Sequence, residues 1–310
     1  MHAGSHARHG AGTGLTRLPR RSRRTHPSTI LRAGRHWGTV RAMPTSREDS
    51  ALIRESLREV SLERFEARIL ELAEPCLRFT SRRATVPVGA SKLGGDPDLP
   101  PDLAWPVIEG QSLTFLAQLD LVELARLLPS PLPGQGRLVF FFDRSDFFVG
   151  ERACRVMHVE GDVVRRRRPS DHEPIDECAL TFTIGTSLPR SFTPFLELLG
   201  PMTEAEQERL RDWDIRDRLG GSGGHHQVLG YPGQIQEDVL ITRAVEAGFE
   251  PTSTATLHQE ARRYRQLLGL DTDDAAGLQW VDMGACWFLI AHADLERQDF
   301  SRTSSVVQFC

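Results

Sequence analysis

Apolar residues recur at helical spacing from about residue 49 to residue 74. Those that set the spacing are Leu52, Ile53, Leu57, Val60, Leu62, Phe65, Ile69 and Leu72. Ser46 or Ser50 can cap the start of this segment, and Pro75 stops it. The pattern predicts one or two amphipathic helices lying on a sheet, followed by a strand over 76–85.

Alternating or continuous apolar runs predict further strands along the rest of the chain. These cover residues 113–121, 138–142, 152–159, 178–184, 264–271, 286–290 and 305–309. Short helices are expected at 122–127 and near 294–295, and a longer polar helix at 203–219, where Thr203 and Glu206 form a capping box.

Two pairs of strands resemble each other in pattern. Residues 115–120 resemble 265–271, and 138–142 resemble 287–290. An internal duplication would explain both matches, with a strand, a loop, a buried strand and a helix in each half. Chance is the alternative, because two strands of unrelated origin can look alike.

A stretch rich in glycine and proline interrupts these elements at 91–106. Gly94 and Gly95 can take positive φ without steric cost, so the chain can turn sharply there. The four prolines between residues 97 and 106 fix φ and remove backbone donors, which excludes helix interior and central strand. We expect a stiff, ordered loop with Leu99 and Trp105 as apolar anchors, and such a loop commonly holds a functional group in place.

Lys92 is the only lysine, and every other strong cation is an arginine. An ammonium is a compact, strongly hydrated charge, unlike the planar guanidinium fork. One hypothesis is that Lys92 supplies a charge or donor to a site at the Gly94-Gly95 turn. The alternative is that a single lysine persists by chance or aids solubility.

The composition of the chain disfavours several classes of protein, among them nucleic-acid binders and membrane-spanning proteins. The chain has 310 residues with 39% apolar, and a net charge of −4. Residues 1–50 hold ten arginines against Glu48 and Asp49, so residues 51–310 carry −12 and are not typical of a nucleic-acid binder. No apolar run reaches the ~18 residues of a membrane span. Five scattered cysteines form no C-x-x-C pair, so neither zinc nor a disulfide framework is indicated, and reduced thiols in the cytoplasm are expected.

The first 42 residues are basic and lack apolar periodicity. We expect a disordered tail at 1–42 and a single domain at 43–310. The tail is either a basic arm or targeting peptide, or an artefact of a start site at Met43, and we favour the artefact.

Several other motifs give weaker indications. Residues 220–224 predict a flexible hinge without the ending of a phosphate loop. His225 and His226 would point to opposite faces of a strand, so they do not predict a metal site. The run Arg165–Arg168 could bind an anion, but a solvated run is the commoner case. Gln118 interrupts an apolar strand and must find partners.

The motifs resemble, in order, those of the YwqG-like family, a bacterial domain of unknown function. The matching positions are Ser91 to Pro100, Trp105-Pro106, Leu113 to Asp120, Gly230-Tyr231-Pro232, Gln236, Leu268 to Thr272, Trp280, Asp282, Gly284, Asp294, Phe300 and Cys310. The resemblance covers about residues 50–310, with Val281 where the family usually has glycine. It implies a cytoplasmic α+β domain with mixed, mainly antiparallel sheets and flanking helices, and no established activity.

Three functions are compatible with these residues. We favour a non-catalytic module that binds a small molecule or protein in a cleft near the Gly94-Gly95 loop, without a cofactor, metal, nucleic acid or membrane. The candidate ligand-binding residues are Lys92, Gly94, Gly95, Trp105, Gln118, Tyr231, Gln236, Trp280 and Asp282. An enzyme using Lys92, Gln118 and Asp282, with His226 or Asp96, is the second hypothesis. The third is a structural domain with no site.

Overall fold

The computed structural model describes residues 45–145, 153–170, 172–190, 192–215, 218–219 and 226–310. All of them lie in the second of the two units into which the chain divides, Arg35–Cys310. The expected tail at 1–42, its boundary at Met43, the hinge at 220–224 and His225 lie outside the described residues.

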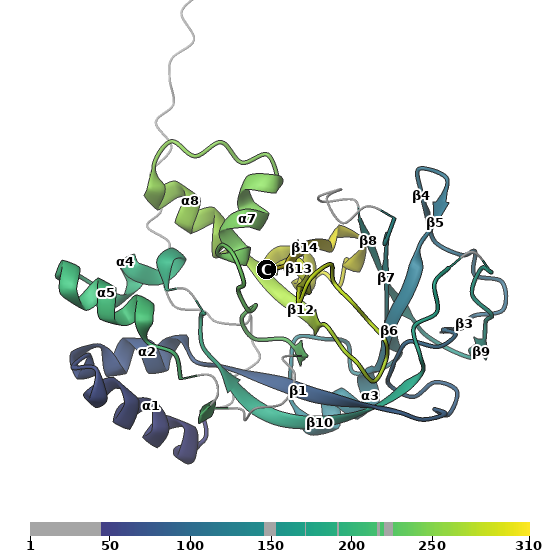
Figure 1. The fold of residues 1–310 in the computed structure, drawn as a ribbon, viewed down its shortest axis with the longest axis horizontal. Coiled ribbons are helices and arrows are strands. Elements are labelled where there is room, and N and C mark those ends of the chain that lie inside the picture. The colour runs from purple at the N-terminus through teal and green to yellow at the C-terminus, as the bar shows by residue number, and fades with distance from the viewer. Residues whose placement is uncertain (1–44, 146–152, 171, 191, 216–217, 220–225) are drawn as a thin grey trace, which may run out of the picture. The chain divides into compact units, whose positions relative to one another are not determined.

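Within the described residues, ten strands form one antiparallel sheet. Their order is β14 (Ser304–Gln308), β13 (Ala285–Ala291), β12 (Tyr264–Asp271), β11 (Gln227–Val228), β1 (Glu74–Arg83), β10 (Cys178–Ser187), β2 (Lys92–Leu93), β6 (Thr114–Asp120), β7 (Arg137–Phe142) and β8 (Cys154–Val159). The long strands β1 and β10 pair along their whole length (Figure 1). The sheet nearly closes, since Cys154 Sγ at one edge lies 3.6 Å from the carbonyl oxygen of Thr303 beside the other.

The sheet has an internal two-fold pattern about the centre of β1 and β10. Thr80 pairs with Thr181 there, and the strands beyond follow the same succession on both sides. β6 and β12 each carry a bulge, at Leu116 and Leu267, against the next strand. Phe140 and Phe288 hold equivalent places in β7 and β13, and their ring centroids lie 5.2 Å apart. These matches confirm the predicted duplication and the α+β class.

The first strand of each half pairs with a strand of the other half. β1 begins the first half but pairs with β11 of the second, and β10 begins the second half but pairs with β2 of the first. The two halves are therefore interlocked rather than placed side by side.

The two faces of the sheet are covered differently. One face forms the main apolar core, with side chains from both halves. On the other face, the second half packs under helices, and the first half packs under two small ribbons, β3 (Asp98–Leu99) with β9 (Val164–Arg165) and β4 (Val107–Ile108) with β5 (Gln111–Ser112). Figure 1 shows α1, α2, α4 and α5 near one end of the β1–β10 pair and the ribbons near the other.

The helices follow the predicted pattern in part. α1 (Arg47–Glu59), η1 (Glu63–Phe65) and α2 (Glu66–Leu72) form the expected amphipathic segment, and Ser46 caps α1. α3 (Leu121–Leu127) follows β6 directly, and the short helices η3 (Thr193–Phe195), α4 (Leu196–Leu199), α9 (His292–Glu296) and η4 (Phe300–Arg302) complete the connections.

One predicted helix is shorter than expected. The capping box of Thr203 and Glu206 is present, but α5 (Glu204–Asp212) ends before Trp213, whose indole is buried and donates to Ser56 of α1. The helices α7 (Val239–Glu246) and α8 (Thr254–Ala261) were not predicted. None of the helices in the described ranges is both long and apolar enough to span a membrane.

Candidate functional site

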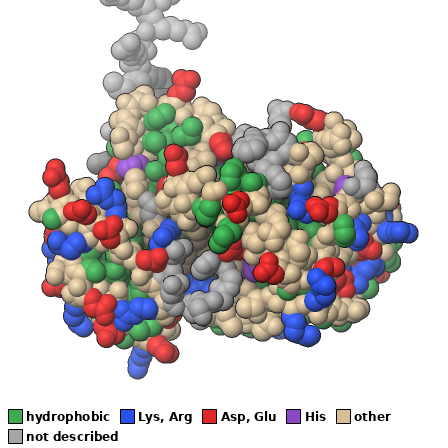
Figure 2. All heavy atoms as spheres, viewed as in Figure 1, with side chains coloured by type: hydrophobic (Ala, Val, Ile, Leu, Met, Phe, Trp, Pro, Cys, Tyr) green, Lys and Arg blue, Asp and Glu red, His purple; other side chains and the backbone are tan. Residues whose placement is uncertain are grey.

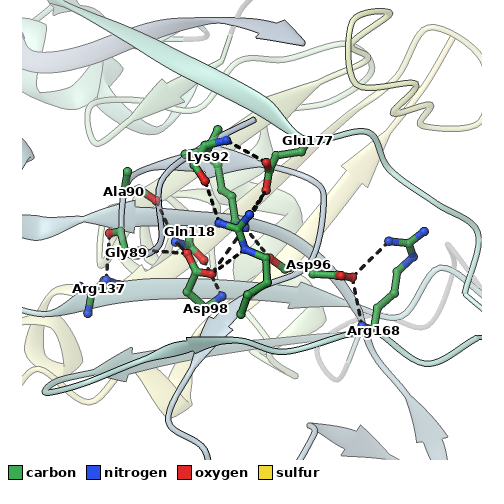
Figure 3. A network of polar contacts seen from close by, with 11 residues as sticks. Gly89, Ala90, Lys92, Asp96, Asp98, Gln118, Arg137, Arg168 and Glu177 are labelled. Carbon is green, nitrogen blue, oxygen red and sulfur yellow. Dashed lines mark hydrogen bonds and ion pairs between the residues drawn. The ribbon is translucent and has the colours of Figure 1, made fainter. Parts of the chain in front are cut away.

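The first turn of the sheet, after β2, encloses Lys92 completely. Gly94 and Gly95 both take positive φ, as expected, and Gly94 donates its N–H to the bulge carbonyl of Leu116. Lys92 is 0% exposed. Its ammonium contacts the carbonyl oxygen of Asp96, lies 3.0 Å from Glu177 Oε2 and 3.8 Å from Asp98 Oδ1 (Figure 3).

Asp98 is the centre of this cluster. Its Oδ2 accepts hydrogen bonds of 2.8 Å from Gly89 N–H and Gln118 Nε2, and its Oδ1 accepts one of 2.9 Å from Arg165. Burial alone would raise the pKa of the Asp98 carboxyl, but these donors and the charge of Lys92 outweigh it and hold the pKa below its ordinary value. Conversely, burial lowers the pKa of Lys92, although both acidic neighbours oppose that shift.

The arginine run closes this turn from outside. Arg165 pairs with Asp98 and Glu177, Arg166 donates to carbonyls of residues 100, 101 and 103, and Arg168 pairs with Asp96. The prediction of a solvated run is therefore wrong for these three residues, because each one has its partner in the 96–103 loop. The charges at the first turn are thus matched within the protein, and a ligand role for Lys92, Gly94, Gly95 and Gln118 stays a prediction.

The second turn, after β11, repeats the backbone of the first. Leu229 and Gly230 take φ of 64° and 70°, against 65° and 71° at Gly94 and Gly95. Leu229 donates its N–H to the bulge carbonyl of Leu267, as Gly94 does to Leu116. A proline follows two residues after each pair, at Pro97 and Pro232.

The side chains at the second turn differ from those at the first. Gln227 stands where Lys92 stands and donates to the carbonyl of Tyr231, as Lys92 does to that of Asp96. Glycines 233 and 269 replace the hydrogen-bonded pair Asp98 and Gln118. A Cβ at Gly233 or Gly269 would lie 3.2 or 3.1 Å from the indole of Trp287, so this ring takes the space that the polar pair fills in the first half.

A cavity remains at the second turn. Its wall includes Arg78 of β1, Gln227 of β11 and Trp287 of β13, which belong to one cross-strand row with Gly269 of β12. Residues 231–235 and parts of β10 complete its wall. The volume of the cavity is about 100 Å³, whereas a single water molecule needs on the order of 10 to 15 Å³. The cavity can therefore hold a small molecule.

Three polar atoms in this wall have no hydrogen-bond partner within the described ranges. Gln227 and Gln266 use their Nε2 atoms on backbone carbonyls of the turn, and within the described residues no donor reaches the Oε1 of either. Trp287 lies in the same wall, and among the described residues its Nε1 has no acceptor. Gln266 is 1% and Trp287 5% exposed. None of the three atoms is among the fully enclosed polar atoms that lack a partner. Each is therefore open to the cavity, where it can bond to water or to a polar ligand.

Other predicted site residues lie apart from this cavity. Asp282 is on an exposed turn, where Val281 and Met283 take positive φ; Val281 thus adopts the conformation that favours glycine. Trp280 is fully buried against Phe142.

Trp105 donates to the carbonyl of Leu113 and packs on Phe141, in the small core of the first half. Gln236 is exposed, and its N–H donates to Gln308. Of the predicted ligand-binding residues, Tyr231 lines the cavity, and its hydroxyl donates to the carbonyl of Leu72.

His226 belongs to a buried structural pair. Its Nδ1 accepts from the N–H of Asp271, so Nε2 carries the proton toward Asp273 at 2.9 Å. In the first half Ser91 occupies the same place and accepts from the N–H of Asp120. His226 thus anchors β12 rather than facing the cavity. In the described ranges no group of three metal-ligating side chains converges.

The sequence signal for the cavity was present but not recognised. The sequence marks Gly230-Tyr231-Pro232 as a family motif and Tyr231 as a candidate ligand-binding residue, yet it places Arg78, Gln266 and Trp287 only in strands. Their common position follows from the cross-strand register, which the duplication would have supplied.

Residues 91–309 match a family described as a domain of unknown function, DUF1963. The chain belongs to this family, which confirms the resemblance drawn from its motifs. Comparison with curated proteins gives no match.

Proposed function

We propose that this protein is a non-catalytic binding protein and that its ligand occupies the cavity at the second turn. The observation that carries the proposal is a set of three polar atoms in the wall of one small hollow, Gln227 Oε1, Gln266 Oε1 and Trp287 Nε1, that have no hydrogen-bond partner among the described residues. The equivalent space in the first half is filled by Asp98 and Gln118, whose polar atoms are paired.

The composition of the cavity favours binding over catalysis. Besides Arg78, Arg190 and Asp271, its wall holds amides, a tryptophan and a tyrosine. The nearby His226–Asp273 pair is occupied in holding β12. On the face shown in Figure 2, acidic and basic side chains are intermixed over the described surface. This mixture does not favour a long polyanion as partner, so a small molecule is the better candidate.

The test uses the full chain with ¹⁵N-labelled tryptophan, which gives one indole N–H signal for each of the five tryptophans. W287F assigns the signal of interest. Small polar metabolites are then titrated one at a time. We expect at least one of them to shift the Trp287 signal in a saturable manner.

A cavity-filling variant provides the control. Ala285 lines the cavity on the same face of β13 as Trp287, so A285L should weaken that binding by about tenfold or more. A104L adds the same atoms at an exposed position and should leave binding unchanged. Thermal unfolding checks that A285L is folded. The proposal is wrong if no metabolite shifts the Trp287 signal, or if folded A285L binds as tightly as the wild type.

A further inference from the structure

Two charged groups in the wall of the cavity have no ionic partner among the residues that the structure describes. Arg78 on β1 donates to the carbonyls of Leu219 and Thr186, and within the described residues no carboxylate pairs with it. Asp271 at the end of β12 accepts only from the N–H of Thr272, and among the described residues no cation pairs with it. Within the described part of the chain, one positive and one negative group therefore line the same small space without an ion-pair partner.

The remaining cation in the wall is already neutralised. Arg190 forms an ion pair with Asp214. The first turn gives the contrast, because there Lys92, Arg165, Asp98 and Glu177 neutralise one another. An unpaired charge in a partly buried site is costly unless an opposite charge is supplied. At the second turn no described residue supplies it to Arg78 or Asp271, so a charged ligand could.

The register separates the two charges. Arg78 pairs with Gln227, which pairs with Gly269, and Asp271 lies two residues further along β12 on the same face. The same wall holds the amide oxygens of Gln227 and Gln266, which can accept from an ammonium or amide N–H. It also holds the indole N–H of Trp287, which can donate to a carbonyl or carboxylate oxygen.

Resting on the binding function proposed above, we infer that the ligand is a small zwitterion, an amino acid or a dipeptide. Its carboxylate lies at Arg78, and its ammonium lies at Asp271 and the amide oxygens. Trp287 lines the space beside the ligand. A volume of about 100 Å³ suits a molecule of this size and is below the several hundred Å³ typical of sites for larger ligands.

The test titrates the full chain with each of the twenty common L-amino acids and with glycylglycine, following the Trp287 indole signal. Each probe that binds is compared with its N-acetyl form, which lacks the ammonium, and its amide, which lacks the carboxylate. We expect each change to raise Kd by about tenfold or more, and the free amino acids and the dipeptide to show which length fits.

Asp271→Asn keeps the oxygen that accepts from Thr272 and removes the charge, so it should raise Kd for the zwitterion by about tenfold while leaving the affinity of the N-acetyl form unchanged. Asp120→Asn is the matched control at the equivalent position of the first half and should bind like the wild type. If neutral metabolites bind but zwitterions do not, or if D271N binds the zwitterion as tightly, the inference is wrong and the binding function stands. If neither zwitterions nor other metabolites shift the Trp287 signal, both are wrong.

Discussion

The turn after β2 and the turn after β11 have the same backbone conformation but different side chains. Both have two consecutive residues at positive φ, both bond to a bulge in the next strand, and both continue to a proline. The first encloses a buried network of charges, whereas the second has a tryptophan and a cavity. The comparison teaches that the duplicated backbone sets the place of a site, and that a few side chains decide whether this place is filled or open.

The largest expected effect comes from removing the centre of the filled turn. Asp98→Ala leaves Lys92 and Arg165 without their shared carboxylate in a buried setting, and breaking such a network costs about 3–5 kcal/mol. Urea unfolding of wild type and variant measures the loss.

Asp96→Ala is the control for this variant. Asp96 is in the same loop, but its carboxylate and its partner Arg168 are 28% and 34% exposed, so the loss should be about 1 kcal/mol or less. Equal losses for the two variants would mean that burial of the network is not what stabilises the first turn.

An intermediate effect is expected at low pH from the His226–Asp273 pair of the second half. Burial would raise the pKa of Asp273, but hydrogen bonds from His226, Ser81 and the N–H of Ala276 outweigh it and lower the pKa to about 2. An unfolded aspartate has a pKa of about 3.9. The pair therefore stabilises the fold fully above about pH 5, and this stabilisation of about 2 kcal/mol is lost as the pH falls from about 4 to 2.

Asp273→Asn should accordingly flatten the acid limb of the stability curve, measured by urea unfolding between pH 2 and 7. The difference from wild type should be largest at neutral pH and shrink toward pH 2. A difference that is the same at pH 3 and pH 7 would contradict the assignment.

The smallest expected effect comes from a substitution at Gly269, which tests whether Trp287 at the second turn needs a glycine beside it. A Cβ at Gly269 would lie 3.0 Å from Gln266 Oε1 and 3.1 Å from Trp287, so Gly269→Ala should destabilise the protein by about 1 kcal/mol through overpacking. Gly134→Ala meets no atom within 4 Å and should change stability by less than about 0.5 kcal/mol. If G269A is as stable as G134A, Trp287 does not depend on that glycine for its place.

Much of the fold could be predicted because local patterns decide it. The amphipathic segment that forms α1 and α2, the strands β6, β7, β12 and β13, and the Gly94-Gly95 turn each have a periodicity or a backbone requirement that short stretches reveal. Lys92 and Gln118 were also correctly singled out as unusual, since a lone lysine and an amide in an apolar strand both need partners.

The contents of the site could not be predicted in the same way. Arg165 and its neighbours look solvated in sequence because Asp96 and Asp98 are about 70 residues away along the chain. Asp282 looked like a companion of Lys92, yet the structure places it on an exposed turn. Arg78, Gln227 and Trp287 share a wall only through the register of three pairs of strands, which no single stretch encodes.

The exchange of first strands between the halves has a consequence for a chain that contains only one half. A chain with only one half would carry a ten-residue strand whose natural neighbour belongs to another copy. Such a chain would complete its sheet by association with an identical molecule. The present protein thus has the architecture expected of two such molecules joined in one chain, with a cavity in one half and a network of charges in the other.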